Sequence, residues 1–327
     1  MVFKPKSVLP IFDTIPLPGI GIRRADRTEG VRFDLPGAKM KKYLLVSTLV
    51  IASSGAAFAD VSLSGDARMG IASVKGGDYN FSSRARVRFS LSGETDSGLK
   101  FGAQFRANEA ADTAASDKGT GTVFIEMPDY GKLTMGDTDG AVQAAVTQLA
   151  PIGFDDTQKL QEFTFLTGGD TGKGKDLLYT YTSGALSFSA SIGNPGAASG
   201  SGSSANKDDS AIGVAYTTEF WKVAAGYEDN GVNSQTVLSG SYGNGQFEVK
   251  GVYGQRDDDK SQYVVYGTYI IGTNTLTAFY RDDEIKATKA TGFGVAHDFG
   301  SGLVFSAGYA KEEAKDANVS VGLTMAF

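Results

Sequence analysis

Short stretches of alternating hydrophobicity, repeated along most of the chain, constrain its fold most strongly. From residue 60 onward, segments of about ten residues alternate apolar and polar side chains, and Gly, Asp, Asn or Ser separates one segment from the next. The same region contains no apolar run long enough for a membrane-spanning helix, and it shows no sustained helical period. The pattern therefore predicts an all-β protein whose antiparallel strands close into a barrel.

We expect sixteen strands, an even number that places both ends of the barrel chain on one side. The segments are 61–74, 80–94, 98–109, 121–128, 131–137, 176–183, 185–194, 209–218, 220–229, 234–243, 246–256, 260–271, 274–283, 288–298, 302–312 and 316–327. Tight turns such as 95–98 and 128–131 alternate with connections that include the long segments 138–175 and 195–208. This alternation is typical of a transmembrane barrel with short periplasmic turns and long outer loops.

The segment before the barrel predicts export. Residues 40–59, MKKYLLVSTLVIASSGAAFA, combine two lysines, a short apolar stretch and an A-x-A cleavage site, which together define a secretory signal peptide. Cleavage is expected before Asp60, so that residues 60–327 form the mature barrel. Because a signal peptide normally occupies the extreme N-terminus, we interpret residues 1–39 as an overcalled upstream segment, with Met40 as the true start.

Composition excludes several functional classes. The chain has no Cys and one His, which excludes thiol chemistry and disulfide scaffolds and leaves little for acid–base catalysis, so no enzyme is expected. The chain has 31 basic and 37 acidic residues, of which nine basic and four acidic residues lie in the first 59 positions. Cleavage before Asp60 therefore leaves 22 basic and 33 acidic residues and a net charge of −11. This balance argues against nucleic acid as a partner and indicates a weak preference for cations.

Three arginines occupy one face of a predicted strand. In SSRARVRFSLSGETDSGLKFGAQFRA (residues 82–107), Arg84, Arg86 and Arg88 alternate with apolar residues. Each arginine on a lipid-facing surface would cost about 2 to 4 kcal/mol at the bilayer midplane, so this face must point into a water-filled lumen. Adjacent like charges are tolerated there if they are solvated or face carboxylates.

Four stretches resemble the alphaproteobacterial, Rhodobacter-type general diffusion porins. They are DVSLSGDARMGI (60–71), the stretch 82–107, GKLTMGDTDGA (131–141) and the closing VSVGLTMAF (319–327). The resemblance extends over residues 60–327 and is most specific in the first third and the last strand. It implies a trimer of sixteen-stranded barrels in the Gram-negative outer membrane, each with a long third loop folded into the lumen. It also implies passive diffusion of small hydrophilic solutes and ions through a charged constriction.

The resemblance also implies which residues form the constriction. The basic wall would comprise Arg84, Arg86, Arg88, Lys100 and Arg106, where Lys100 shares the lumen-facing parity of the others. The acids of the constriction loop, residues 138–175, would be Asp137 at its root and Asp139, Asp155, Asp156 and Glu162 within it. For Glu126 the strand parity leaves open whether the side chain faces the lumen.

Partners and alternatives complete the expectations. The terminal Phe327 is typical of strands recognised by the barrel assembly machinery, and the outer surface would meet lipid and lipopolysaccharide. No cofactor is expected, with calcium at loop carboxylates such as Asp257–Asp259 as the alternative. Three other functions remain open: a solute-specific channel of the same fold, a non-catalytic surface adhesin or structural barrel, and an outer-membrane enzyme, which would need a nucleophile with a positioned base.

Overall fold

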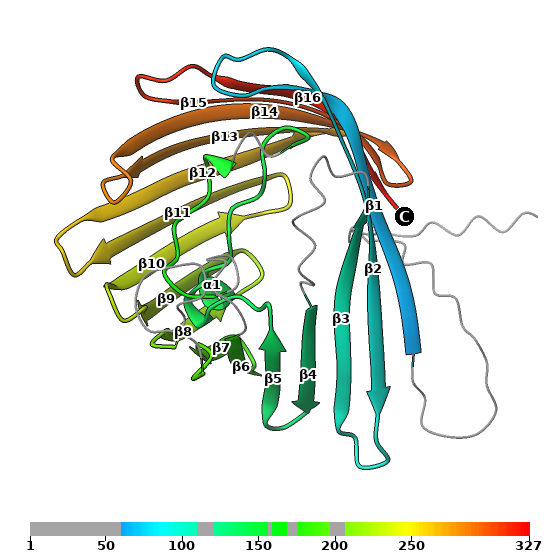
Figure 1. Ribbon diagram of the computed structural model, residues 1–327, viewed down its shortest axis with the longest axis vertical. Coiled ribbons are helices and arrows are strands. Elements are labelled where there is room, and N and C mark those ends of the chain that lie inside the picture. The colour runs from blue at the N-terminus through cyan, green and yellow to red at the C-terminus, as the bar shows by residue number, and fades with distance from the viewer. Residues whose placement is uncertain (1–59, 110–120, 156–158, 169–175, 197–206) are drawn as a thin grey trace, which may run out of the picture. The chain divides into compact units, whose positions relative to one another are not determined.

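The computed structural model describes residues 60–109, 121–155, 159–168, 176–196 and 207–327. Within this part of the chain, sixteen antiparallel strands follow one another around a closed barrel, and the last strand pairs with the first (Figure 1). The predicted strand number and topology are confirmed. The predicted signal peptide and the segment 1–39 lie outside the described residues.

The strand bounds agree with the predicted segments to within two residues. They are β1 Asp60–Ser73, β2 Asn80–Glu94, β3 Lys100–Glu109, β4 Gly121–Met127, β5 Gly131–Gly136, β6 Asp176–Ser183, β7 Leu186–Ile192, β8 Ser210–Thr217, β9 Trp221–Asp229, β10 Ser234–Gly243, β11 Phe247–Arg256, β12 Ser261–Ile271, β13 Asn274–Asp283, β14 Thr288–Gly300, β15 Leu303–Glu312 and β16 Asn318–Ala326. The one helix among the described residues is α1, Ala141–Val146. No described helix is long and apolar enough to cross a membrane.

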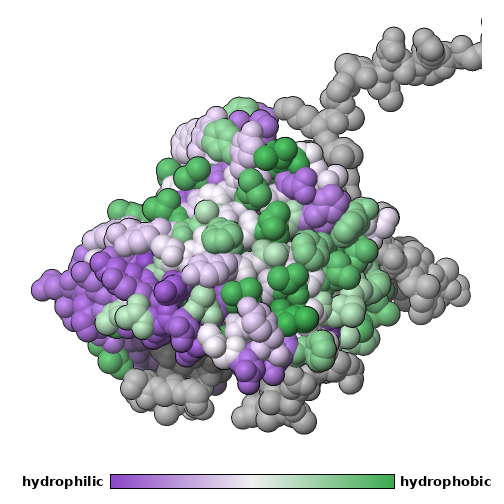
Figure 2. All heavy atoms as spheres, turned by 90° about the horizontal axis from the view of Figure 1, so that it is seen from above, coloured by the Kyte–Doolittle hydropathy of each residue, from purple (hydrophilic) through white to green (hydrophobic). Residues whose placement is uncertain are grey.

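The outer face of the barrel is apolar. Large apolar side chains are exposed at alternate positions, as at Met69 and Ile71 in β1 and at Phe81, Val87 and Leu91 in β2. Figure 2 shows one face of the molecule, on which hydrophobic side chains spread over the middle and hydrophilic ones gather toward one end. A contiguous apolar surface of this kind is suited to hydrocarbon rather than to water.

Aromatic residues mark the end of the barrel at which the short turns lie. Tyr130, Trp221, Tyr242 and Phe299 are all exposed, and each lies in or beside a short connection. The amphipathic rings of the two tyrosines and the tryptophan are placed as in the aromatic belts found at membrane interfaces. This end of the barrel is therefore suited to an interface between lipid and water.

The buried core lies inside the barrel, between the long connection after β5 and the inner wall. On the loop side it consists of Ala141, Val142, Ala145, Val146, Leu149, Ile152, Leu160, Phe163 and Phe165. On the wall side, β6 and β8 to β15 contribute larger residues such as Val237 and also small ones such as Ala211 and Ala224. Figure 1 shows α1 on the concave side of these strands. The loop therefore packs along the inner wall from β6 round to β16 and β1, where Phe154 lies against Gly322 and Gly70.

Glycines on the inner wall make this packing possible. A Cβ added at Gly226 would lie 2.7 Å from Cγ2 of Val142, and one added at Gly308 would lie 2.7 Å from the backbone of Gly153. Contacts this short do not occur between real side chains, so larger residues at these positions would displace the loop. The run of small inward-facing residues thus has a physical role in seating the loop.

Replacing Gly226 with Leu is expected to lower the free energy of unfolding by about 1 to 3 kcal/mol, the usual cost of overpacking a core. The measurement is the thermal unfolding midpoint in detergent. Gly240→Leu is the matched control, because a Cβ at Gly240 meets nothing within 4 Å and the residue shares the lipid-facing parity of Leu238 and Tyr242. Equal thermal unfolding midpoints for the two variants would contradict the role of Gly226 in the packing of the loop on the wall.

Candidate functional site

The arginines of β1, β2 and β3 form one cluster on the inner wall. Arg68 lies opposite Arg84, and Arg88 lies opposite Arg106 in the strand register. The interleaved residues point outward, as the exposure of Val87 shows. We call the cluster the basic wall, and it consists of Arg68, Arg84, Arg86, Arg88 and Arg106.

Of the carboxylates that the structure describes, that of Asp66 lies within the basic wall. Asp66 is opposite Arg86 in the register, and its Oδ1 lies 2.7 Å from the Arg86 guanidinium and 3.2 Å from that of Arg84. Arg86 also donates from Nε to both carboxylate oxygens, at 2.9 and 3.0 Å. Asp66 offsets part of the repulsion between the arginines, and all three side chains keep some contact with solvent.

Sequence reasoning missed Asp66 and Arg68. Both lie in the GDAR stretch of β1, two residues apart and therefore on one face of the strand. No signal within β1 distinguishes these residues from an ordinary polar face. They gain their importance from the antiparallel register with β2, which brings them opposite Arg86 and Arg84.

Lys100 does not join the basic wall. It shares the inward parity of Arg106, but six residues of extended strand, about 20 Å, separate the two. Lys100 lies instead near the short-turn end of the barrel, opposite Glu94 and Glu126. The same register answers the open question about Glu126, which faces inward beside Lys100.

Two of the predicted loop acids lie near the basic wall. Asp137 is exposed at the root of the loop, within electrostatic range of Arg106. Asp155 lines a cleft that it shares with Arg68. Asp139 has a different place: its backbone bridges to Gly168 at the neck of the loop, and its carboxylate accepts a hydrogen bond from Gln143 at 3.0 Å.

The remaining predicted acids do not extend this group. Asp156 lies outside the described residues. Glu162 forms an ion pair with Lys159 at 3.2 Å and lines a separate pocket with Arg281 and Lys286, which no residue of the basic wall lines. Parity and proximity in sequence could not distinguish these positions, because the path of the loop is set by its packing on the wall.

Buried polar side chains hold the second half of the loop in place. We call them the polar clamp: Glu228 of β9, Gln235 of β10, Gln262 of β12, and Arg281 and Asp283 of β13. The fully buried carboxylate of Glu228 accepts hydrogen bonds from the backbone N–H groups of Leu166 and Thr167, at 3.0 and 3.1 Å, and from the Thr167 hydroxyl at 2.9 Å.

Thr164 is the second point that the clamp holds. Gln262 accepts from the Thr164 N–H at 3.0 Å and donates to its carbonyl at 2.7 Å. Arg281 donates to the Thr164 hydroxyl at 3.0 Å and is paired with the buried Asp283. Buried charges are stable only when they are paired and hydrogen-bonded, so the clamp and the loop depend on each other.

The helical end of the loop is held by the wall as well. Nζ of Lys250 in β11 donates to the carbonyls of Val146 and Thr147, both at 2.8 Å, where α1 ends. At the other end of α1, the Ser191 hydroxyl accepts from the N–H of Ala141 at 2.9 Å. Free carbonyls at a helix C-terminus carry partial negative charge, which suits the lysine.

Ion pairs hold the acidic turn between β11 and β12. Asp258 pairs with Arg256 and lies 3.5 Å from Nζ of Lys260. The hydrogen bond that Arg256 donates holds the pKa of Asp258 below its ordinary value. Among the described residues, no three His, Cys, Asp or Glu side chains group in a way that could hold a metal ion.

Comparisons with known proteins agree with this geometry. A family model described as Gram-negative porin matches residues 46–317. A porin of Rhodobacter capsulatus is 32% identical over 308 residues, covering 82% of this chain and 99% of the relative, and a porin of Fuscovulum blasticum is 25% identical over 296 residues, covering 80% and 99%. A solved porin structure refined at 1.8 Å resolution aligns with a TM-score of 0.70 and 30% identity, covering 82% of this chain and all of that one.

Proposed function

The chain belongs to the family of Gram-negative porins, and from this premise we propose how its lumen selects solutes. It is an outer-membrane diffusion channel, through which small hydrophilic solutes and ions pass passively, and it catalyses no reaction. The observation that supports our proposal is the position of the basic wall, which faces a lumen that also contains the loop acids Asp137 and Asp155.

The basic wall and these acids act together as an electrostatic filter. Fixed charges of opposite sign beside a narrow passage create a field within it, which orients water and polar solutes. A polar solute replaces its contacts with water by contacts with these charged side chains. An apolar solute must displace ordered water without such contacts and therefore meets a higher energy barrier. The packed loop narrows the passage and so limits the size of the solutes.

The assembly and surroundings of the channel are part of the proposal. We propose a homotrimer, surrounded by outer-membrane lipid and lipopolysaccharide, in which Phe327 serves the barrel assembly machinery. The Phe327 side chain is exposed, and its backbone exchanges hydrogen bonds with Gly65 of β1 at 2.9 and 3.1 Å. An accessible aromatic group at the end of the last strand is suited to recognition by the barrel assembly machinery.

The mature protein is expected to begin at Asp60. Intact-mass analysis of protein purified from outer membranes should give a mass that corresponds to residues 60–327, because the A-x-A site ends at Ala59. Ala59→Arg should block cleavage and leave a longer species, while Ser64→Ala, which lies inside the mature chain, should be processed normally. A wild-type mass that includes residues before Asp60 would contradict the proposed site.

Planar-bilayer recording tests the channel itself. Protein spanning residues 60–327 should insert with large ohmic current steps in multiples of three, as expected for a trimer. In liposome swelling, uptake of neutral sugars should fall smoothly with solute size, whereas a solute-specific channel would favour one sugar out of size order. Silent bilayers from a correctly folded barrel would contradict the proposal and favour an adhesin or a structural barrel.

A further inference from the structure

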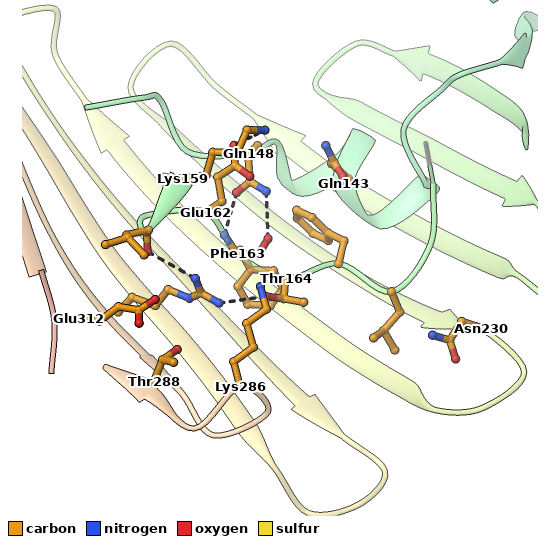
Figure 3. A pocket seen from close by; sticks show the side chains of 14 residues that line it. Gln143, Gln148, Lys159, Glu162, Phe163, Thr164, Asn230, Lys286, Thr288 and Glu312 are labelled. Carbon is orange, nitrogen blue, oxygen red and sulfur yellow. Dashed lines mark hydrogen bonds and ion pairs between the residues drawn. The ribbon is translucent and has the colours of Figure 1, made fainter. Parts of the chain in front are cut away.

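A second polar site lies apart from the basic wall. It is a pocket of about 570 Å³ that lies beside loop residues 159–166 (Figure 3). On the wall side it is lined near the C-terminal ends of β13 and β15 and at the start of β14. Pockets that bind small molecules commonly measure about 300 to 1,000 Å³, so this pocket is large enough for one small solute.

The floor of the pocket is preformed. It includes Thr164, which Gln262 and Arg281 of the polar clamp hold through its backbone and its hydroxyl. Beside Thr164, the Gln148 amide donates to the carbonyl of Phe163 and accepts from its N–H, at 3.0 and 2.9 Å. A floor fixed in this way loses little conformational entropy when a solute binds.

Within the described part of the chain, one cation of the pocket makes no ion pair. Lys159 is paired with Glu162, and Arg281 is paired with Asp283. For Lys286, in the connection between β13 and β14, the described residues offer no ion pair within 4.0 Å, and Figure 3 shows its side chain pointing into the pocket. Lys286 stays accessible to solutes, although neighbouring protein displaces part of its water and thereby lowers its pKa.

Two neutral donors also face the pocket without partners among the described residues. The Thr288 hydroxyl lies two residues from Lys286 in the chain. Asn230 lies on the far side (Figure 3), and because its Oδ1 accepts from the N–H groups of Val232 and Asn233, its amide nitrogen is left to donate.

The charges and donors together define what would fit. We propose that the pocket is a docking site for small hydroxylated monocarboxylates, whose carboxylate binds Lys286 and Thr288 and whose hydroxyl groups bind Asn230 and the acids Glu162 and Glu312. One unpaired cation matches one negative charge. A second negative charge on the solute would meet Glu162 and Glu312, which already act electrostatically on Lys286 together with Asp283. The inference rests on the proposed function, because the solutes in question are ones that the proposed channel would admit.

Gluconate is the probe, with sorbitol as its uncharged counterpart. In planar bilayers at about 0.1 M KCl, where screening is moderate, millimolar gluconate should interrupt the single-channel current. In Lys286→Gln, the half-blocking concentration should rise at least about fivefold, the loss expected for one charge-assisted contact. Sorbitol should block far less, because it cannot engage Lys286. Thr288→Val provides a second variant if Lys286→Gln folds poorly.

Lys289→Gln is the matched control. Lys289 is three residues from Lys286, but it is paired with Asp282 at 3.1 Å and does not line the pocket, so the block should be unchanged. Equal block in wild type and Lys286→Gln, or equal block by sorbitol and gluconate, would overturn the docking site while leaving the channel intact. If no variant conducts in KCl alone, the proposed function fails, and calorimetric titration of the purified barrel with gluconate then decides the site separately.

Discussion

Replacing Arg84, Arg86 and Arg88 together with Ala is expected to shift the channel strongly toward cations. In water, a fixed charge 4 to 8 Å from a passing ion is worth about 0.5 to 1 kcal/mol, which changes the local anion concentration about two- to sixfold for each charge. Three such charges act together on one passage. The measurement is the reversal potential across a tenfold KCl gradient, compared with that of wild type.

Two variants control for this result. Asp66→Asn removes the carboxylate that pairs with Arg84 and Arg86, so its reversal potential should move in the opposite direction, toward anions. Lys100→Ala removes an inward-facing cation about 20 Å from Arg106, and its effect should be smaller than that of the triple variant. An unchanged reversal potential in a correctly folded triple variant would contradict the role of the basic wall.

Removing Glu228 is expected to release the constriction loop without opening the barrel. Glu228→Ala leaves the buried N–H groups of Leu166 and Thr167 without their acceptor, at a cost of about 1 to 3 kcal/mol for each. The strand ladder does not depend on this side chain, so the barrel should keep its heat-modifiable mobility on gels. The current should change from steady levels to fluctuating substates, and trypsin should cleave after Lys159.

The conservative change and a matched control separate the clamp from a general effect of charge. Glu228→Gln retains one carbonyl acceptor, so the current through this variant should fluctuate less than the current through Glu228→Ala. Glu248→Ala removes another inward-facing carboxylate, which makes no hydrogen bond to the loop among the described residues, and its current should stay steady. Steady current and protease resistance in Glu228→Ala would show that apolar packing alone holds the loop.

The strands were predictable because their signal is local. Alternation of side chains between lipid and lumen follows from the extended backbone, so each strand carries its own evidence, and all sixteen were found to within two residues. The arginines of β2 were predictable for the same reason, since the cost of a charge in lipid decides the face of Arg84, Arg86 and Arg88. Their inward parity required no knowledge of any other strand.

The constriction was only partly predictable because it is assembled from strands and from a loop that have no common period. Lys100 has the same parity as Arg106, yet distance along β3 separates them. Glu162 lies in the loop together with Asp155, yet it lines a different pocket. Parity gives the direction of a side chain but not its height in the lumen, and sequence within an irregular loop gives neither.

The sequence by itself determined the barrel, its strand number and the face of each arginine, because these depend on backbone periodicity and on the difference between lipid and water. Only the tertiary structure decided which charges meet. The register of β1 against β2 brought Asp66 to Arg86 and Arg68 to Arg84, and buried partners such as Glu228 and Gln262 set the path of the loop. These contacts join one strand to another or a strand to the loop, so the pattern within a single segment does not encode them.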